Sequence, residues 1–233
     1  MKEYIGRTFN SLHDRGEALS LGPARLVECE FVNCHLSLTK VFEKRSTVRG
    51  VHLQRCSVKG GSVGPAILEE VTVEDLASND LLLVWGALFR HVKLSGRIGK
   101  LKLNPFVDPV DRSVPTQGPL EAFRERYYGS VDWALDISEA RFVEFDFRGI
   151  PARLVRRDPE SQVVVTRGRA LAPGWRDRVS SSNRLWPFVI RLFLQDGDQD
   201  IVLVAPLGAP RRKRDELLAG LRELRALGVA EPD

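Results

Sequence analysis

Between residues 24 and 147, small or apolar residues recur in pairs whose two members are separated by one residue. Successive pairs begin five residues apart over long stretches, as with Ala24 and Leu26, then Cys29 and Phe31. A period of five fits neither an α-helix nor a straight β-strand. It favours short strand segments with a corner after each one. Further pairs begin at Cys34, Thr39, Ser46, Val51, Cys56, Gly61, Ala66, Val71, Leu76, Leu81, Ala87, Val92, Leu101, Leu135, Ala140 and Phe145.

The two members of each pair differ in size. The first is often small and the second is nearly always large, whereas the residue between them is frequently polar, as at Arg25, Glu30 and His35. Because side chains alternate along a strand, both members point to one side and the residue between them to the other. The pattern therefore predicts a β structure with a core of alternating small and bulky residues.

The runs Ala24-Arg-Leu26-Val-Glu, Cys29-Glu-Phe31-Val-Asn and Cys34-His-Leu36 resemble the pentapeptide-repeat family. The resemblance covers about residues 20–104 and 131–150, although the Asp or Asn typical of the second position is nearly absent. It implies a mainly β fold, a right-handed quadrilateral β-helix with four pentapeptides per coil. Because such β-helices often pair end to end, it is also compatible with a homodimer.

The sequence predicts two domains, 1–150 and 151–233. Outside the repeat, the first domain is expected to contain a cap and an insertion. Residues 1–20 are expected to cap the repeat, and residues 104–130 to form an insertion in which a loop is followed by a helix starting near Pro119. Residues 151–233 predict a small α/β unit. Its expected strands and helices are 162–166, 186–194, 201–205 and 215–227.

Composition excludes several classes of protein. The chain has 233 residues, of which 43% are hydrophobic and 28% charged, so it can build a sizeable core and is not intrinsically disordered. It contains no long apolar run and starts without the hydrophobic region of a signal peptide. These features predict a cytoplasmic protein that does not bind membranes.

The sequence contains no recognisable catalytic, metal or cofactor motif. Cys29, Cys34 and Cys56 lack the spacing of a zinc site and are expected to be reduced core thiols. The acidic run Asp196-Gly-Asp198-Gln-Asp200 begins like a calcium loop, but its Gly and closing Glu are misplaced. We therefore expect no catalytic residue, metal or cofactor, and the protein is predicted not to be an enzyme.

The function favoured at this point is that of a non-enzymatic protein-binding module. The rigid faces of a β-helix suit a protein partner, as in an inhibitor or a toxin-immunity-type protein. Aromatic side chains and Arg dominate the binding energy of protein interfaces. The candidate partner-binding residues, for each of which core packing is the competing interpretation, are Arg126, Tyr127, Tyr128, Trp133 and Trp175.

The alternative is a nucleic-acid-binding or DNA gyrase/topoisomerase-interacting protein. The net charge is only +4, which is low for a dedicated DNA-binding protein but unlike the strongly acidic surface that mimicry of DNA requires. Two basic stretches carry this alternative, namely Arg90, Lys93, Arg97, Lys100 and Lys102, and Arg211, Arg212, Lys213 and Arg214.

Overall fold

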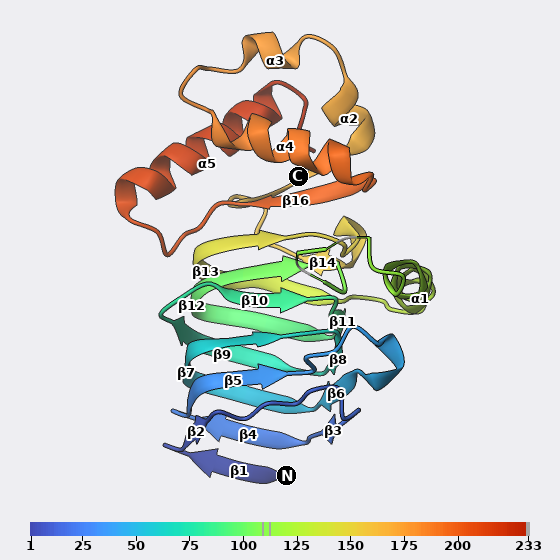
Figure 1. Ribbon diagram of the computed structural model, residues 1–233. Helices are drawn as coiled ribbons and strands as arrows, with labels where there is room; N and C mark the ends of the chain where they lie inside the picture. Colours follow the sequence, from blue (N-terminus) through green and yellow to red (C-terminus); the bar gives the residue numbers. More distant parts are fainter. Residues whose placement is uncertain (109, 112, 232–233) are drawn as a thin grey trace.

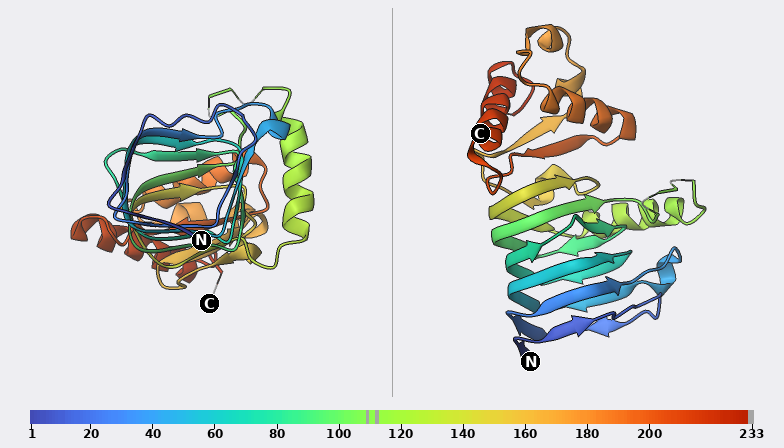
Figure 2. Two further views of the ribbon diagram at one scale, coloured as in Figure 1. Left: turned by 90° about the horizontal axis from the view of Figure 1, so that it is seen from below. Right: turned by 60° about the vertical axis from the view of Figure 1, so that its left-hand side comes forward.

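A computed structural model describes residues 1–108, 110–111 and 113–231. Parallel strands form a closed wall around an apolar core, a helix lies against the outside of this wall, and a helical unit covers the end that is formed last in the sequence (Figures 1 and 2). Residues 109, 112, 232 and 233, which belong to the predicted insertion and C-terminal unit, lie outside the described residues.

The wall consists of two parallel sheets. The ten-stranded sheet contains β1 (Lys2–Ile5), β2 (Thr8–Asn10), β4 (Ala24–Val27), β5 (Glu30–Leu36), β7 (Val51–Val63), β9 (Thr72–Ser78), β10 (Leu82–Trp85), β12 (Val92–Asn104), β13 (Leu135–Phe147) and β14 (Val155–Arg156). The four-stranded sheet contains β3 (Ser20–Leu21), β6 (Ser46–Arg49), β8 (Ala66–Glu69) and β11 (Leu88–Arg90).

The quadrilateral β-helix expected from the pentapeptide pattern is wrong. The wall has two sheets rather than four equal faces, and β7, β12 and β13 each continue for 13 residues through the bends where a pentapeptide coil would turn. The interval between paired residues also changes along the wall, because loops of different length separate the strands. Leu82 pairs with Leu101, Ala24 with Val51, and Val92 with Leu135. The fold is instead a mainly β, barrel-like closure of parallel strands with helices outside it.

The inward alternation of apolar residues is nevertheless present in the wall. Paired strands place large side chains in register, as where Leu53 pairs with Leu26 on one side and with Val73 on the other. All three belong to or pack against one continuous apolar core. Burial of such ladders supplies most of the driving force for folding.

The residues expected to cap the wall are strands of it. β1, β2 and β3 all lie within the first 21 residues and pair in parallel with β4, β5 and β6. No strand of the described residues covers their outer side, so this end of the wall is open (Figure 1). Several large apolar side chains near it are exposed, with Ile5 at 60% and Leu12 at 55%.

The predicted insertion consists of a loop and α1 (Gln117–Gly129), which lies along the outside of the wall (Figure 2). Its side chains are held by the wall. Tyr127 Oη donates to Glu69 Oε1 at 3.2 Å, and Glu69 also accepts from Arg49. Burial and the neighbouring Glu69 carboxylate raise the pKa of Tyr127, so the phenol remains a donor.

Residues 162–230 surround a second core beyond β13. The two strands of this unit pair antiparallel, and each lies within one residue of its predicted bounds. One face of the pair, with Val164 and Val202, packs on the core of the wall. The elements of this region are β15 (Gln162–Thr166), α2 (Arg167–Leu171), α3 (Trp175–Arg178), α4 (Leu185–Asp196), β16 (Asp200–Val204) and α5 (Arg211–Ala226). Elsewhere in the described residues, 3₁₀ turns are formed by η1 (Phe42–Lys44) and η2 (Ala152–Leu154).

A buried carboxylate joins the first strands to the rest of the wall. Asp14 is 6% exposed and accepts hydrogen bonds from Gly16 N, Glu17 N, Ser37 N and Ser46 Oγ, at 2.5 to 3.1 Å. Burial raises the pKa of Asp14, but these hydrogen bonds outweigh it and hold the pKa below its ordinary value of 3.8. The ionised form is therefore the one that the fold stabilises.

We expect the free energy of unfolding to decrease as the pH is lowered through the range in which Asp14 becomes protonated. Its folded pKa lies below the unfolded one, so its contribution is present above about pH 4 and is lost as the pH decreases. Asp14→Asn, which places an amide among four donors, is expected to cost about 1–3 kcal/mol at neutral pH and to flatten this dependence. Urea unfolding across the pH range measures both effects. The exposed Asp80 provides the matched control, Asp80→Asn, and equal pH profiles for the two variants would contradict the assignment.

Candidate protein-interaction site around Trp133

Trp133 lies on the outside of the wall, in the segment between α1 and β13, and its side chain is partly exposed. The His91 ring stacks on it, with centroids 4.7 Å apart and planes inclined by 29°. The guanidinium carbon of Arg156 lies 4.2 Å from the centroid of the indole ring. Three segments that are distant in sequence thus meet at one aromatic side chain.

The neighbours of Trp133 are themselves fixed. His91 occupies the corner between β11 and β12 with a φ of 54°, and its backbone N–H donates to Trp133 O at 3.2 Å. Its Nε2 lies 2.6 Å from Asp132 Oδ1. That hydrogen bond lowers the pKa of Asp132, so the carboxylate remains ionised. The indole is therefore presented in one orientation rather than as a mobile surface residue.

Three exposed arginines belong to this cluster or to the segments that adjoin it. Arg156 stacks on Trp133, Arg90 precedes His91, and Arg153 Nη2 donates to Tyr128 O at 3.3 Å. None of the three forms an ion pair with a carboxylate among the described residues, although Arg90 lies opposite Glu69 and Arg156 opposite Asp136 in the strand registers. Asp132 is engaged by His91. We call this surface the Trp133 patch, and it consists of Arg90, His91, Asp132, Trp133, Arg153 and Arg156.

The other predicted partner-binding residues have different positions. Tyr128 and Trp175 are each only 3% exposed, so they pack inside and cannot anchor a partner at the surface. Tyr127 joins α1 to the wall through Glu69, as described above. Arg126 is exposed on the last turn of α1, next to Tyr127. Of the five predicted partner-binding residues, Trp133 and Arg126 are therefore the two whose side chains remain accessible to a partner.

The first basic stretch does not form a uniformly positive surface. Along β12, Lys93 pairs with Glu139 at 2.8 Å and Lys102 with Asp146 at 3.3 Å, both acids on β13. Lys100 lies opposite Glu144 in the same register. Arg90, the first residue of this basic stretch, lies on β11 and belongs to the Trp133 patch. Charges of β12 are thus mostly balanced by the neighbouring strand.

One position of β12 is an exception. Arg97 lies opposite Arg141 on β13, and the loop before α5 contacts this part of the strand, where Gly208 N donates to Phe142 O at 2.7 Å. The second basic stretch starts α5 directly after that loop. Arg211 and Arg214 both contact Asp215, so part of its charge is also balanced. This side of the molecule is mixed in charge, with Arg97 and Arg141 as its cationic centre.

The residues considered for metal and redox chemistry have structural positions. Cys29 and Cys56 are buried free thiols, and burial raises the pKa of Cys56. In the acidic run, Asp196 pairs with Arg148 and Asp200 accepts from Ala152 N at 2.8 Å. Within the described ranges no group of three or more His, Cys, Asp and Glu is arranged to hold a metal ion.

The sequence did not place His91, Asp132, Arg153 or Arg156 among the partner-binding candidates. Asp132 adjoins the predicted Trp133, which was a usable signal, but His91 and Arg156 reach the indole only because β12 and β14 both pair with β13. Over the part of the chain that the structure describes, no helix has the length and apolar character needed to cross a membrane.

Comparison with protein-family models and with curated proteins gave no match for this chain. The resemblance to pentapeptide-repeat proteins therefore stays a prediction.

Proposed function

We propose that the protein is a non-enzymatic, cytoplasmic protein-binding module, of the inhibitor or toxin-immunity type, that holds an acidic segment of its partner on the Trp133 patch. The observation that carries the proposal is the ordered, partly exposed indole among arginines that lack a carboxylate partner in the described chain. Trp and Arg dominate the energetics of protein interfaces. A partner carboxylate would supply the ion pairs that Arg90, Arg153 and Arg156 do not form with the described residues.

We expect Trp133→Ala to abolish capture of the partner. Loss of a central Trp commonly costs about 2–4 kcal/mol of binding free energy, or roughly 30-fold to 1,000-fold in affinity. The wild-type protein and the variant are immobilised, exposed to lysate of the source cell, and the retained proteins are quantified by mass spectrometry.

Phe188→Ala is the matched control. Phe188 is an exposed aromatic residue, 45% accessible, and it also contacts an arginine, with Arg191 5.2 Å from its ring centroid, but it lies on α4. The proposal requires one stoichiometric protein that the wild type and Phe188→Ala retain and Trp133→Ala does not. Equal retention by both variants, or no stoichiometric protein at all, would refute it.

Nucleic-acid binding is the second candidate, favoured by Arg97 and Arg141 beside the start of α5. It is the weaker one because acidic neighbours interrupt the basic surface and because the Trp133 ring already contacts two side chains, so base stacking would have to displace one of them. Nucleic acid recovered at low salt, lost at high salt and lost in the Arg97→Glu variant would establish it in place of the protein partner.

We also propose that the open end of the wall pairs with a second copy. Edge strands with free backbone groups readily accept another strand. β1 and β2 belong to the ten-stranded sheet and β3 to the four-stranded sheet, so a twofold copy of the same end is the partner best shaped to cover all of them at once. Ile5→Glu is expected to convert a dimer into a monomer in sedimentation velocity, whereas Val110→Glu, at a position 91% exposed elsewhere, leaves it unchanged. A wild-type protein that sediments as a monomer at all concentrations would exclude the pairing.

A further inference from the structure

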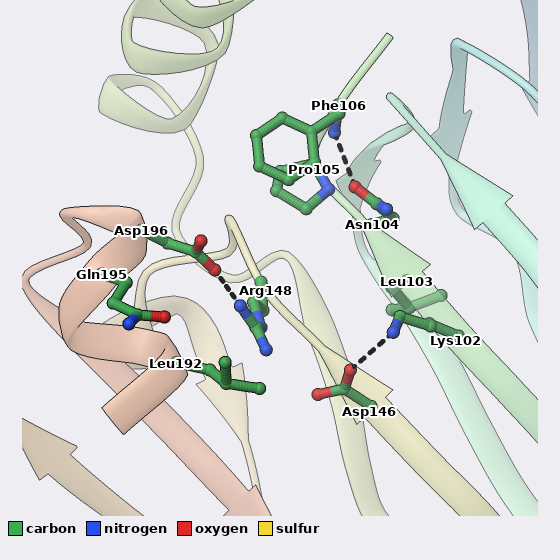
Figure 3. Close-up of a pocket in the computed structure, with 10 residues that line it drawn as sticks. All are labelled: Lys102, Leu103, Asn104, Pro105, Phe106, Asp146, Arg148, Leu192, Gln195 and Asp196. Carbon is green, nitrogen blue, oxygen red and sulfur yellow. Dashed lines mark hydrogen bonds and ion pairs between the residues drawn. The ribbon is translucent and has the colours of Figure 1, made fainter. Parts of the chain in front are cut away.

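A cavity of about 340 Å³ lies between the wall and the C-terminal unit (Figure 3). The ends of β12 and β13 and the segment that follows β12 form one side, and α4 forms the other. Its volume is at the lower end of the range of about 300–1,000 Å³ that is usual for small-molecule sites, which also occur preferentially where two units meet. The Trp133 patch shares none of its lining residues.

The charged groups of this cavity are balanced. Two cations, Lys102 and Arg148, face two carboxylates, Asp146 and Asp196. The inner pair, Arg148 and Asp196, is largely buried, with side chains 14% and 11% exposed. The outer pair, Lys102 and Asp146, is 42% and 38% exposed. A simple anion or cation entering the cavity would therefore meet a like charge as well as an opposite one.

Both pairs retain capacity for a ligand. Lys102 Nζ lies 3.3 Å from Asp146 Oδ2, which is longer than the roughly 2.7–2.9 Å of a strong charged hydrogen bond. Arg148 donates to Asp196 through Nη1 and makes no other hydrogen bond or ion pair that joins it to a described residue, and the nearby Asp198 carboxylate interacts with it only electrostatically. Figure 3 places that guanidinium between Asp196 and the Lys102–Asp146 pair. The Arg148 guanidinium, with donors to spare, and the weakly paired Asp146 carboxylate thus both line the cavity.

From this arrangement we propose that the cavity binds a free α-amino acid with an apolar side chain. The ligand carboxylate takes the remaining donors of Arg148, and its ammonium group replaces Lys102 as the partner of Asp146. Pro105 and Leu192, which also line the cavity, receive the side chain. A zwitterion satisfies both signs of charge, which no singly charged ligand can do here. The proposal is independent of the protein partner.

The test compares leucine with two analogues on the wild-type protein by titration calorimetry. N-acetyl-leucine lacks the ammonium group and leucinamide lacks the carboxylate. Loss of a charged hydrogen-bond partner weakens binding by about tenfold or more, so leucine is expected to bind at least that much more tightly than either analogue. No binding of leucine, or equal binding of all three, overturns the proposal.

A variant assigns the ammonium contact. Asp146→Asn is expected to lower the affinity for leucine by about tenfold. The affinity for N-acetyl-leucine is expected to stay unchanged, since that analogue has no ammonium group to contact Asp146. Glu139→Gln, at the carboxylate of β13 that pairs with Lys93 outside the cavity, is the matched control. Unchanged leucine affinity in Asp146→Asn contradicts the proposed orientation. The ligand comparison on the wild-type protein remains decisive should the variant fold poorly.

Discussion

Gly61→Ala is expected to lower the free energy of unfolding by about 3 kcal/mol or more. Gly61 lies in β7 opposite Cys34 of β5, with a φ of 145° that residues with a side chain rarely adopt. A Cβ atom at this position would lie 2.3 Å from the Cys34 carbonyl oxygen. Because that oxygen is backbone and cannot rotate away, one strand must shift from the other. Since domains are stable by only about 5–15 kcal/mol, this is a large fraction of the total.

Urea unfolding followed by circular dichroism measures the effect, and Gly118→Ala is its control. Gly118 lies in the first turn of α1, and a Cβ atom there would meet nothing within 4 Å. Alanine is expected to stabilise that position by about 0.5–1 kcal/mol because it restricts the unfolded chain. If both alanines change stability alike, the close approach of β5 and β7 at Gly61 does not exist.

Phe142→Ala is expected to cost about 3–5 kcal/mol. Phe142 is 1% exposed at the end of the core that the C-terminal unit covers, and its ring stacks on Phe145 with centroids 3.9 Å apart. Truncation leaves a cavity that the surrounding strands can fill only in part. The lower stability is expected to appear as a lower urea concentration at the midpoint of unfolding, with an unchanged dependence of the unfolding free energy on urea concentration.

The adjacent residue tests the register of the strand. Val143 is 37% exposed because alternate side chains of β13 point outward, so Val143→Ala is expected to change stability by no more than about 0.5 kcal/mol. A shift of the strand by one residue would exchange the two effects. A greater loss at Val143 than at Phe142 would therefore show that β13 is paired in another register.

Local pattern predicted individual elements well. The run of three valines between Gln162 and Thr166 marked β15, and the leucines after Arg214 marked α5. These signals lie within a few residues of each other. The global arrangement was predicted wrongly, because the five-residue rhythm does not reveal that β7, β12 and β13 continue through their bends or that the strands divide into two sheets.

The candidate site was predictable only in part. Trp133 was named as a partner-binding candidate and Arg90 as part of a basic stretch, but Tyr128 and Trp175 were also named and are buried. Aromatic residues serve cores and interfaces equally well, so composition cannot separate the two roles. His91 and Arg156 had no local signal, since their contact with the indole depends on which strands pair with β13.

By itself, the sequence determined which side chains face inward, where most helices and strands occur, and that no known catalytic or metal motif is present. These are properties of neighbouring residues, whose relative directions the backbone geometry sets. The tertiary structure decided how the strands close, which lysines of β12 meet an acid on β13, and that Trp133 meets His91 and Arg156. Those outcomes depend on pairing across loops of unequal length, and only the folded chain brings such distant residues together.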